Sequence, residues 1–158
     1  MTDVHSPEVR SKNMRAIRSS DTKPELIVRR RLHTEGLRYR LGGVGLCGRP
    51  DLVLPKYKAV IFIHGCFWHG HICNKFKLPN TRRDFWEKKI HGNRDRDAKV
   101  VARLEELGWR VAVVWECAIK KAACDSGNTT CSSLISWLKT GIATTFETPT
   151  VDFRGVLG

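Results

Sequence analysis

The sequence lacks any apolar stretch long enough to cross a membrane, and its first residues lack the features of an export signal. No apolar run approaches the ~20 residues that a spanning helix needs. Residues 1–10, MTDVHSPEVR, have no apolar segment behind a basic one. Internal repeats and low-complexity linkers are absent as well. These absences predict a cytoplasmic protein of one domain, because 158 residues can bury a core without disulfides.

Acidic residues are scarce relative to basic ones. The chain has 28 Lys and Arg against 16 Asp and Glu, for a formal net charge of +12. Such a balance favours a polyanionic partner, and nucleic acid leads over acidic lipid because the basic residues do not follow one amphipathic helix with a wide apolar face. The candidates for phosphate contacts are Lys12, Arg15, Arg18, residues 29–31, Arg82, Arg83, Lys88 and Lys89.

Hydrophobic periodicity predicts a chain of mixed helices and strands. Helices are expected over residues 10–19, 23–35, about 84–107 and 131–139, and strands over 37–41, 51–55, 59–63 and 110–115. Asp21 is the predicted N-cap of the second helix, and Thr81 or Asp84 that of the third. The inner face of the third helix is expected to carry Phe85, Trp86, Ile90, Val100, Val101 and Leu104. Residues 141–158 show no period, so the chain divides into a basic arm (1–20), a folded domain (21–140) and a tail (141–158).

Residues 61–73, IFIHGCFWHGHIC, place three histidines, two cysteines and two adjacent aromatics directly after an apolar strand. A further cysteine follows the strand at 110–115, in the segment VAVVWEC. Tetrahedral zinc prefers sulfur and imidazole ligands, and a set filled entirely by protein is structural. We therefore predict a structural Zn²⁺ site made of Cys66, His71, Cys73 and Cys117. Cys47, Cys124 and Cys131 are expected to be reduced thiols.

Phe67 and Trp68 lie between these predicted zinc ligands. An adjacent Phe and Trp are more often part of a core, but a loop flanked by glycine has little room to bury both. Aromatic wedges inserted between base steps cost least at a mispaired site, which gives a preference for mismatches. A packing role and a wedge role are both open at this point, and Trp86 is a candidate to join the pair.

The order of acidic residues and strands resembles the PD-(D/E)xK nuclease fold. Pro50 and Asp51 open a strand that is followed by the apolar strand at 59–63, and Glu25 lies on the preceding helix. In that fold the acids hold Mg²⁺ against the scissile phosphate. The usual D/E-x-K tripeptide is lacking, and residues 62–64, Phe-Ile-His, stand in its place.

Several further blocks, in one order, are similar to the Vsr endonuclease family. They are RSKNMRAI at 10–17, GRPD at 48–51, VIFIHGCFWHGHIC at 60–73, FW at 85–86 and LGWRVAVVWEC at 107–117. The resemblance runs from about residue 3 to residue 120. It implies a single-domain α/β protein with a PD-(D/E)xK-like restriction-endonuclease fold, in which a mixed central sheet is flanked by helices.

The resemblance also implies an activity and the residues that perform it. Vsr-type enzymes nick DNA on the 5′ side of the thymine in a T:G mismatch left by deamination of 5-methylcytosine. If this carries over, Asp51 binds catalytic Mg²⁺ together with the backbone carbonyl of Ile63, a position where the family commonly has threonine. His69 is then the general base and Asp97 orients it, with Glu25 and His64 supporting the site. The residues expected to contact DNA are Met14, Phe67, Trp68, Trp86, Lys89 and Asn93.

Four of these residues also have a structural interpretation from the sequence alone. Asp97 lies in a charged helical segment and could belong to a solvated face, Asp51 could be a turn acid, and His64 could be a satisfied histidine at a strand end. Met14 could pack a helix. A restriction-like nuclease acting on matched or modified DNA, and a non-catalytic zinc-stabilised DNA-binding protein, are the competing functions.

The expected partners follow from the family resemblance. They are double-stranded DNA carrying a T:G mismatch and mismatch-repair proteins such as MutL, with no membrane. The protein is expected to be a monomer in the bacterial cytoplasm, associated with the nucleoid.

Overall fold

A computed structural model describes residues 6–16, 20–43, 45–73, 76–119 and 129–148. The described helices are α1 (Pro7–Ala16), α2 (Lys23–Thr34), α3 (Arg83–Glu106) and α5 (Thr129–Thr140). The strands are β1 (Arg40–Leu41), β2 (Leu52–Leu54), β3 (Ala59–His64), β4 (Arg110–Trp115) and β5 (Thr145–Glu147), with a 3₁₀ turn, η1 (Pro55–Tyr57), between β2 and β3. Within these ranges, no helix combines the length and the apolar character that crossing a membrane requires.

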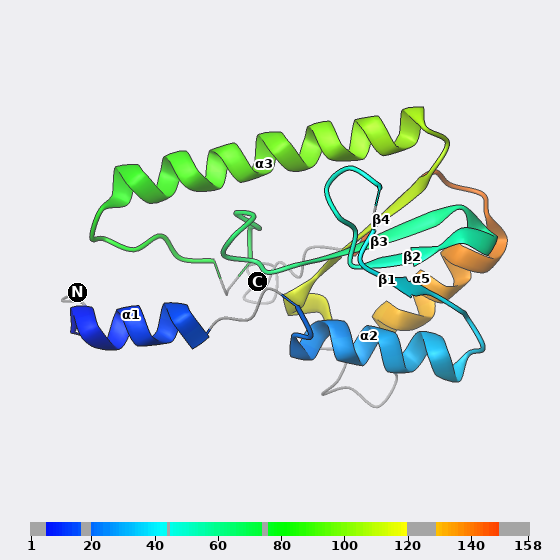
Figure 1. Cartoon of the computed structure of the whole chain (residues 1–158), viewed down its shortest axis with the longest axis horizontal. Helices are drawn as coiled ribbons and strands as arrows, with labels where there is room; N and C mark the ends of the chain where they lie inside the picture. Colours follow the sequence, from blue (N-terminus) through cyan, green and yellow to red (C-terminus); the bar gives the residue numbers. More distant parts are fainter. Residues whose placement is uncertain (1–5, 17–19, 44, 74–75, 120–128, 149–158) are drawn as a thin grey trace, which may run out of the picture.

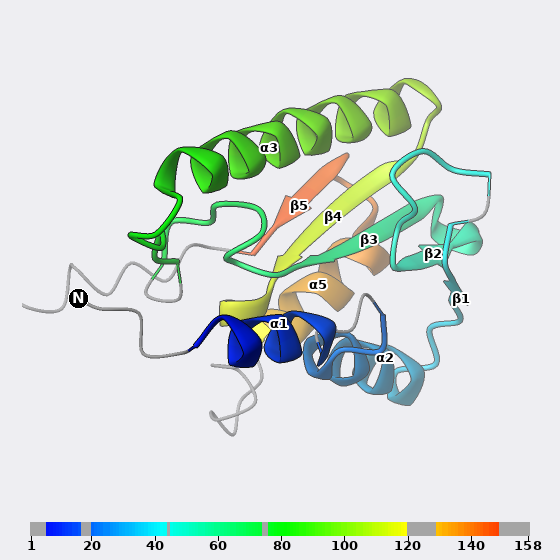
Figure 2. The same cartoon turned by 60° about the vertical axis from the view of Figure 1, so that its left-hand side comes forward.

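The five strands form one sheet in the order β1-β2-β3-β4-β5. The first three strands are antiparallel neighbours, whereas β3, β4 and β5 run parallel. Parallel neighbours need a crossover, and α3 supplies the one between β3 and β4. Figures 1 and 2 show α3 over one face of the sheet and α2 and α5 against the other. The predicted α/β architecture, a mixed sheet with flanking helices, is confirmed.

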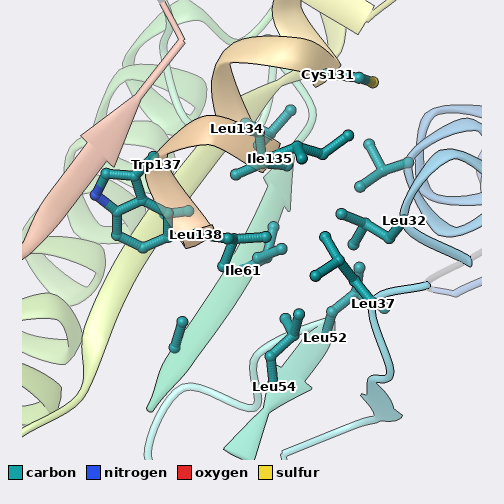
Figure 3. Packing of buried hydrophobic residues seen from close by; sticks show 14 of the residues in the cluster. Leu32, Leu37, Leu52, Leu54, Ile61, Cys131, Leu134, Ile135, Trp137 and Leu138 are labelled. Atoms are coloured by element: carbon teal, nitrogen blue, oxygen red, sulfur yellow. The ribbon is translucent and has the colours of Figure 1, made fainter. Parts of the chain in front are cut away.

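The central strand β3 is buried on both faces, as its uninterrupted apolar sequence indicates. Its odd-numbered residues enter the core between the sheet and the helices α2 and α5. Figure 3 shows Ile61 in this core with Leu134 and Leu138 of α5. Val60 and Phe62 instead pack in a second core with Leu104 of α3. Because side chains alternate along a strand, the same register directs His64 toward α3.

The two predicted helix caps are wrong. Thr22, not Asp21, precedes α2 as its N-cap, and Asp21 has a left-handed φ of 56°. The residue before α3 is Arg82, also left-handed with φ 55°, in place of Thr81 or Asp84. The predicted inner face of α3 is right for Ile90 and Leu104, which are buried.

The predicted position of Phe85 on that inner face is wrong, because its side chain is 45% exposed. It belongs to the first turn of α3, and Figure 2 shows this end of the helix lying beyond the strands of the sheet. An apolar residue there has no core to enter.

The strand β5 is not predicted by the sequence pattern. It is three residues long and largely exposed, and it lies in the segment 141–158, which shows no period. It pairs with β4 from Val111 to Val113 and so extends the sheet beyond residue 140. The predicted strand at 37–41 is shorter than expected, since only Arg40 and Leu41 pair with β2. Of the basic helix expected over 10–19, residues 10–16 belong to α1, and residues 17–19 lie outside the described part.

Candidate active site and metal centre

A cavity of about 600 Å³ lies where α3, the start of β2 and the end of β3 meet the start of α2. All five residues predicted to be catalytic line it: Glu25, Asp51, His64, His69 and Asp97. Ile63 and Trp68 line it as well. They come from positions as far apart as 25 and 97 in the chain. The structure therefore brings the predicted set together.

Asp51 is fixed in this cavity by the neighbouring strand. Its Oδ2 accepts a hydrogen bond of 2.7 Å from the backbone N–H of Ile63. Burial raises the pKa of Asp51 to about 6, although this hydrogen bond opposes the rise, and the negative charge of Glu25 adds to it. A carboxylate whose charge is opposed by burial and by a second carboxylate is one that a cation would stabilise.

Glu25 is buried at the first turn of α2, and its oxygens already have three donors. It accepts hydrogen bonds from the N–H of Asp21 at 3.0 Å, from Thr22 Oγ1 at 3.2 Å and from Arg29 Nη2 at 2.9 Å. Arg29 also contacts Asp21 Oδ1 at 2.5 Å. This network fixes the carboxylate of Glu25, which lines the cavity with Asp51.

The two imidazoles of the cavity are stacked on each other. The rings of His64 and His69 are 3.8 Å apart and nearly parallel, and Nδ1 of His69 is hydrogen-bonded to Asp97 Oδ2 on α3. With Nδ1 directed at a carboxylate, Nε2 is the nitrogen of His69 that can take up a proton.

His64 differs from His69 in burial. Burial, together with the neighbouring His69, lowers the pKa of His64 to about 4. The ring is therefore uncharged near neutral pH. Its buried Nδ1 has no hydrogen-bond partner among the described residues.

The predicted zinc ligands form a second cluster. The donor atoms of Cys66, His71, Cys73 and Cys117 all lie within 4.8 Å of one another. Tetrahedral Zn²⁺ with ~2.3 Å bonds to sulfur needs ligand atoms roughly 4 Å apart, so this donor set fits that ion. Burial raises the pKa of the Cys66 and Cys117 thiols, which keeps them protonated until a metal displaces the proton.

Trp115, at the end of β4, lies between the two clusters. Its ring stacks on His71 at 4.1 Å and meets His64 edge-on at 5.3 Å. Its Nε1–H donates to Glu147 at 2.7 Å and its backbone N–H donates to Thr148 Oγ1 at 3.0 Å. The end of β5 and the residue after it therefore hold the aromatic ring that separates the cluster of possible metal ligands from His64 and His69.

Comparison with known proteins identifies the family of this chain. The family model described as DNA mismatch endonuclease Vsr matches residues 2–75. The DNA mismatch endonuclease Vsr of Escherichia coli K12 is 52% identical over 120 residues, which cover 76% of this chain and 77% of the relative. The chain belongs to the Vsr family of DNA mismatch endonucleases.

Other relatives of this Vsr-family chain carry the name of nicking enzymes. The type II nicking enzyme V.NmeAIP of Neisseria meningitidis serogroup A is 50% identical over 125 residues, covering 78% of this chain and 89% of its own length. V.XorIIP of Xanthomonas oryzae is 50% identical over 119 residues, covering 75% and 88%. The predicted membership of a family of DNA endonucleases is thereby confirmed.

Phe67, Trp68 and Trp86 of this Vsr-family chain form an aromatic cluster outside both cores. The rings of Phe67 and Trp68 are 5.3 Å apart, as are those of Phe67 and Trp86, and Trp68 lies 6.0 Å from Trp86. All three side chains are half-buried. Asn93 of α3 donates from Nδ2 to the carbonyl of Trp68 at 2.8 Å and so fixes the loop that carries the pair.

The other two residues predicted to contact DNA are Lys89 and Met14. Lys89 is exposed on α3. Met14 belongs to α1, but its side chain lies outside the described part of the structure.

The cavity also contains residues to which the sequence analysis gave no role. Arg49, Arg96 and Glu116 line it beside the predicted set. A signal was available for the two arginines, since each stands one or two residues before a predicted catalytic aspartate, Asp51 or Asp97. Trp115 was likewise missed, because its part in the site depends on β5.

Proposed function

We propose that this chain nicks double-stranded DNA on the 5′ side of the thymine in a T:G mismatch left by deamination of 5-methylcytosine, by Mg²⁺-dependent hydrolysis. The observation that supports this most directly is the meeting of Asp51, His69 and Asp97 in one cavity of a Vsr-family chain. The Escherichia coli relative is named a mismatch endonuclease, and the Neisseria relative is named a nicking enzyme. These names favour a cut in one strand.

Asp51 is the residue proposed to hold the catalytic Mg²⁺, with the carbonyl of Ile63 and with Glu25 supporting the site. Bound Mg²⁺ neutralises charge on the phosphate. The Ile63 N–H orients the Asp51 carboxylate, and an isoleucine can offer a backbone carbonyl as well as a threonine does. Burial makes the negative charge of Asp51 unfavourable, and a bound cation would offset that cost.

His69 is the proposed general base. Its Nε2 takes a proton from the attacking water, the water oxygen bonds to phosphorus, one phosphorus–oxygen ester bond breaks, and the departing sugar oxygen takes up a proton from solvent. Asp97 holds Nδ1–H and stabilises the imidazolium that forms. His64, uncharged and stacked on His69, keeps that ring in place.

The scaffold proposed for this chemistry is a PD-(D/E)xK-like fold with a structural Zn²⁺. Pro50 and Asp51 directly precede β2, β2 is antiparallel to β3, and α3 leads to the parallel strand β4. Zn²⁺ held by Cys66, His71, Cys73 and Cys117 would join the loop after β3 to the end of β4. The nuclease domain would then begin near residue 21 and include β5.

The proposed contact with DNA runs from the basic arm, residues 1–20 with Met14, to the aromatic cluster. Phe67, Trp68 and Trp86 would insert at the mispaired step, where unstacking costs least. Lys89 and Asn93 lie on the same helix as Trp86. Three further properties stay predictions: that the enzyme is a monomer, that it acts in the bacterial cytoplasm and nucleoid, and that it works with proteins such as MutL.

The test is single-turnover nicking of a panel of 5′-labelled duplexes with and without Mg²⁺. The panel holds a T:G mismatch in several contexts, including CTWGG, with other mismatches and perfect duplex. We expect one cut, 5′ to the mismatched thymine, only with Mg²⁺. Cutting of both strands of perfect duplex would support the restriction-like alternative, and tight binding without any cut would support the non-catalytic one.

A further inference from the structure

The segment that delivers Asp51 to the cavity has an unusual backbone. Gly48 and Arg49 have consecutive positive φ values, 74° and 47°. Only four non-glycine residues in the described part of the chain have a positive φ: Asp21, Arg49, Lys58 and Arg82. A residue with a side chain costs about 1–2 kcal/mol in the left-handed region, and Arg49 also precedes Pro50, which restricts it further. Arginine at this position is therefore disfavoured by the backbone.

The surroundings hold this segment in place. A Cβ at Gly48 would lie 2.3 Å from Val100 Cγ1 of α3, so only glycine fits against that helix. On the other side, the N–H of Gly43 donates to the Pro50 carbonyl at 3.0 Å and that of Gly42 to the Asp51 carbonyl at 3.3 Å. The backbone at Arg49 cannot relax without moving Asp51.

The Arg49 side chain is exposed, and Arg49 lines the cavity that contains Asp51 and His69. It has no hydrogen-bond or ion-pair partner among the described residues, and the same holds for Arg96 of α3, which also lines the cavity. By contrast, Arg29 of α2, which does not line the cavity, is held by two carboxylates. Two guanidinium groups without a partner in the described part of the protein thus come from two different elements to the place where the proposed reaction occurs.

We propose that Arg49, assisted by Arg96, binds the non-bridging oxygens of the phosphate that is hydrolysed. This inference rests on the proposed function. The planar guanidinium matches two phosphate oxygens at once, which an ammonium cannot do. Fixed donors directed at the oxygens that gain charge in the transition state accelerate the reaction more than they strengthen binding. The strained backbone is retained because it presents this side chain and Asp51 to the same cavity.

The test compares Arg49→Gly, Arg49→Lys and Lys58→Gly. Lys58 is the matched control, because it is an exposed basic residue with φ 49° that follows η1 and does not line the cavity. Replacing Arg49 with glycine removes the backbone strain, so we expect an unchanged or higher Tm while single-turnover nicking falls about 100-fold. Duplex affinity should fall by no more than about tenfold at ~0.1 M salt, the cost of one phosphate contact. Arg49→Lys should recover part of the rate, and Lys58→Gly should nick like the parent chain.

A second measurement does not depend on nicking. Removal of a single phosphate interaction should reduce the slope of log K against log salt for perfect duplex by about 0.9 in Arg49→Gly and not in Lys58→Gly. If the parent chain nicks no duplex, the proposed function fails, while this slope still decides whether Arg49 binds phosphate. An Arg49→Gly rate within threefold of the parent, an unchanged slope, or a fall in Tm that accounts for the lower activity would each overturn the proposal.

Discussion

Residues 64–73, the end of β3 and the loop after it, contribute side chains to two clusters of histidine, cysteine and aspartate. The two clusters differ in their access to solvent. In the Cys66 and His71 cluster the donor atoms face one another, and both named residues are buried. In the His69 and Asp97 pair the side chains are 23% and 30% exposed and line an open cavity. The same ten residues can therefore make a closed site suited to holding the fold and an open one suited to reaction.

The largest expected effect is on the closed cluster. Cys73→Ala should lose its Zn²⁺ and unfold at a much lower temperature, because structural zinc sites contribute roughly 10 kcal/mol or more to folding. The measurements are metal content and thermal unfolding of protein purified without chelator. Cys47→Ala is the control, since Cys47 lies outside the donor set and packs at the edge of the second core. Less than half an equivalent of zinc in the parent chain would remove the zinc assignment.

The open cluster should respond in rate and not in stability. His69→Ala should nick T:G duplex about 10² to 10⁴ times more slowly at nearly normal affinity, the usual cost of losing a general base. Asp97→Asn should show a smaller deficit. The controls are His33→Ala, an exposed histidine of α2, and Asp95→Asn, an exposed aspartate two residues from Asp97. A His69→Ala rate within about threefold of the parent, under saturating enzyme and Mg²⁺, would shift attention to His64.

Replacing Asp51 should raise the stability of the protein and abolish its activity. The pKa of Asp51 in the folded protein, about 6, is above the ordinary value of 3.8, so the folded state binds the proton more tightly and loses stability as pH rises through this window. Without added divalent ion, Asp51→Asn should be more stable than the parent by about 3 kcal/mol well above pH 6 and nearly equal to it near pH 4.

Denaturant unfolding at the two pH values measures this difference, and the same variant should not nick. Asp95→Asn is the control, because its carboxylate is exposed. Equal stabilities of Asp51→Asn and the parent chain above pH 6 would show that burial does not oppose the Asp51 charge.

The smallest effect is expected in the aromatic cluster. Phe67→Ala and Trp68→Ala should reduce the preference for T:G over paired duplex roughly tenfold while leaving non-specific binding nearly unchanged, since stacking is worth ~1 to 3 kcal/mol per base. Competition binding against perfect duplex measures this. Ile142→Ala, an exposed apolar residue outside the loop, serves as control. Full mismatch preference in both variants would assign the pair a packing role only.

The sequence was most informative where one physical effect dominates. The strand predicted at 110–115 has the observed bounds, and the one predicted at 59–63 ends one residue early, because buried β-branched runs leave few alternatives. The catalytic set was predicted from the resemblance to the Vsr family, and its members lie on α2, before β2, at and after the end of β3, and on α3. The helix starts were mispredicted because Asp21 and Arg82 have left-handed φ values, which their residue types do not indicate.

Features that depend on long-range contacts could not be predicted. β5 has three largely exposed residues and forms only because β4 offers an edge. The place of Trp115 in the site depends on Glu147 and Thr148, and that of Arg49 on the fit of Gly48 against Val100. None of these contacts leaves a periodic signal in the sequence.

The parallel pairing of β3 with β4 has a consequence for how the protein is made. The ribosome releases the basic arm and the aromatic loop first, while Cys117 follows the end of β4 and Thr148 lies beyond β5. A nascent chain shorter than 117 residues lacks one of the four sulfur and imidazole donors, and one shorter than 148 lacks a partner of Trp115. The Cys66 and His71 cluster is therefore completed late in synthesis, 20 residues after Asp97, so that a partly made chain carries every proposed catalytic residue before it has the full donor set for the proposed Zn²⁺.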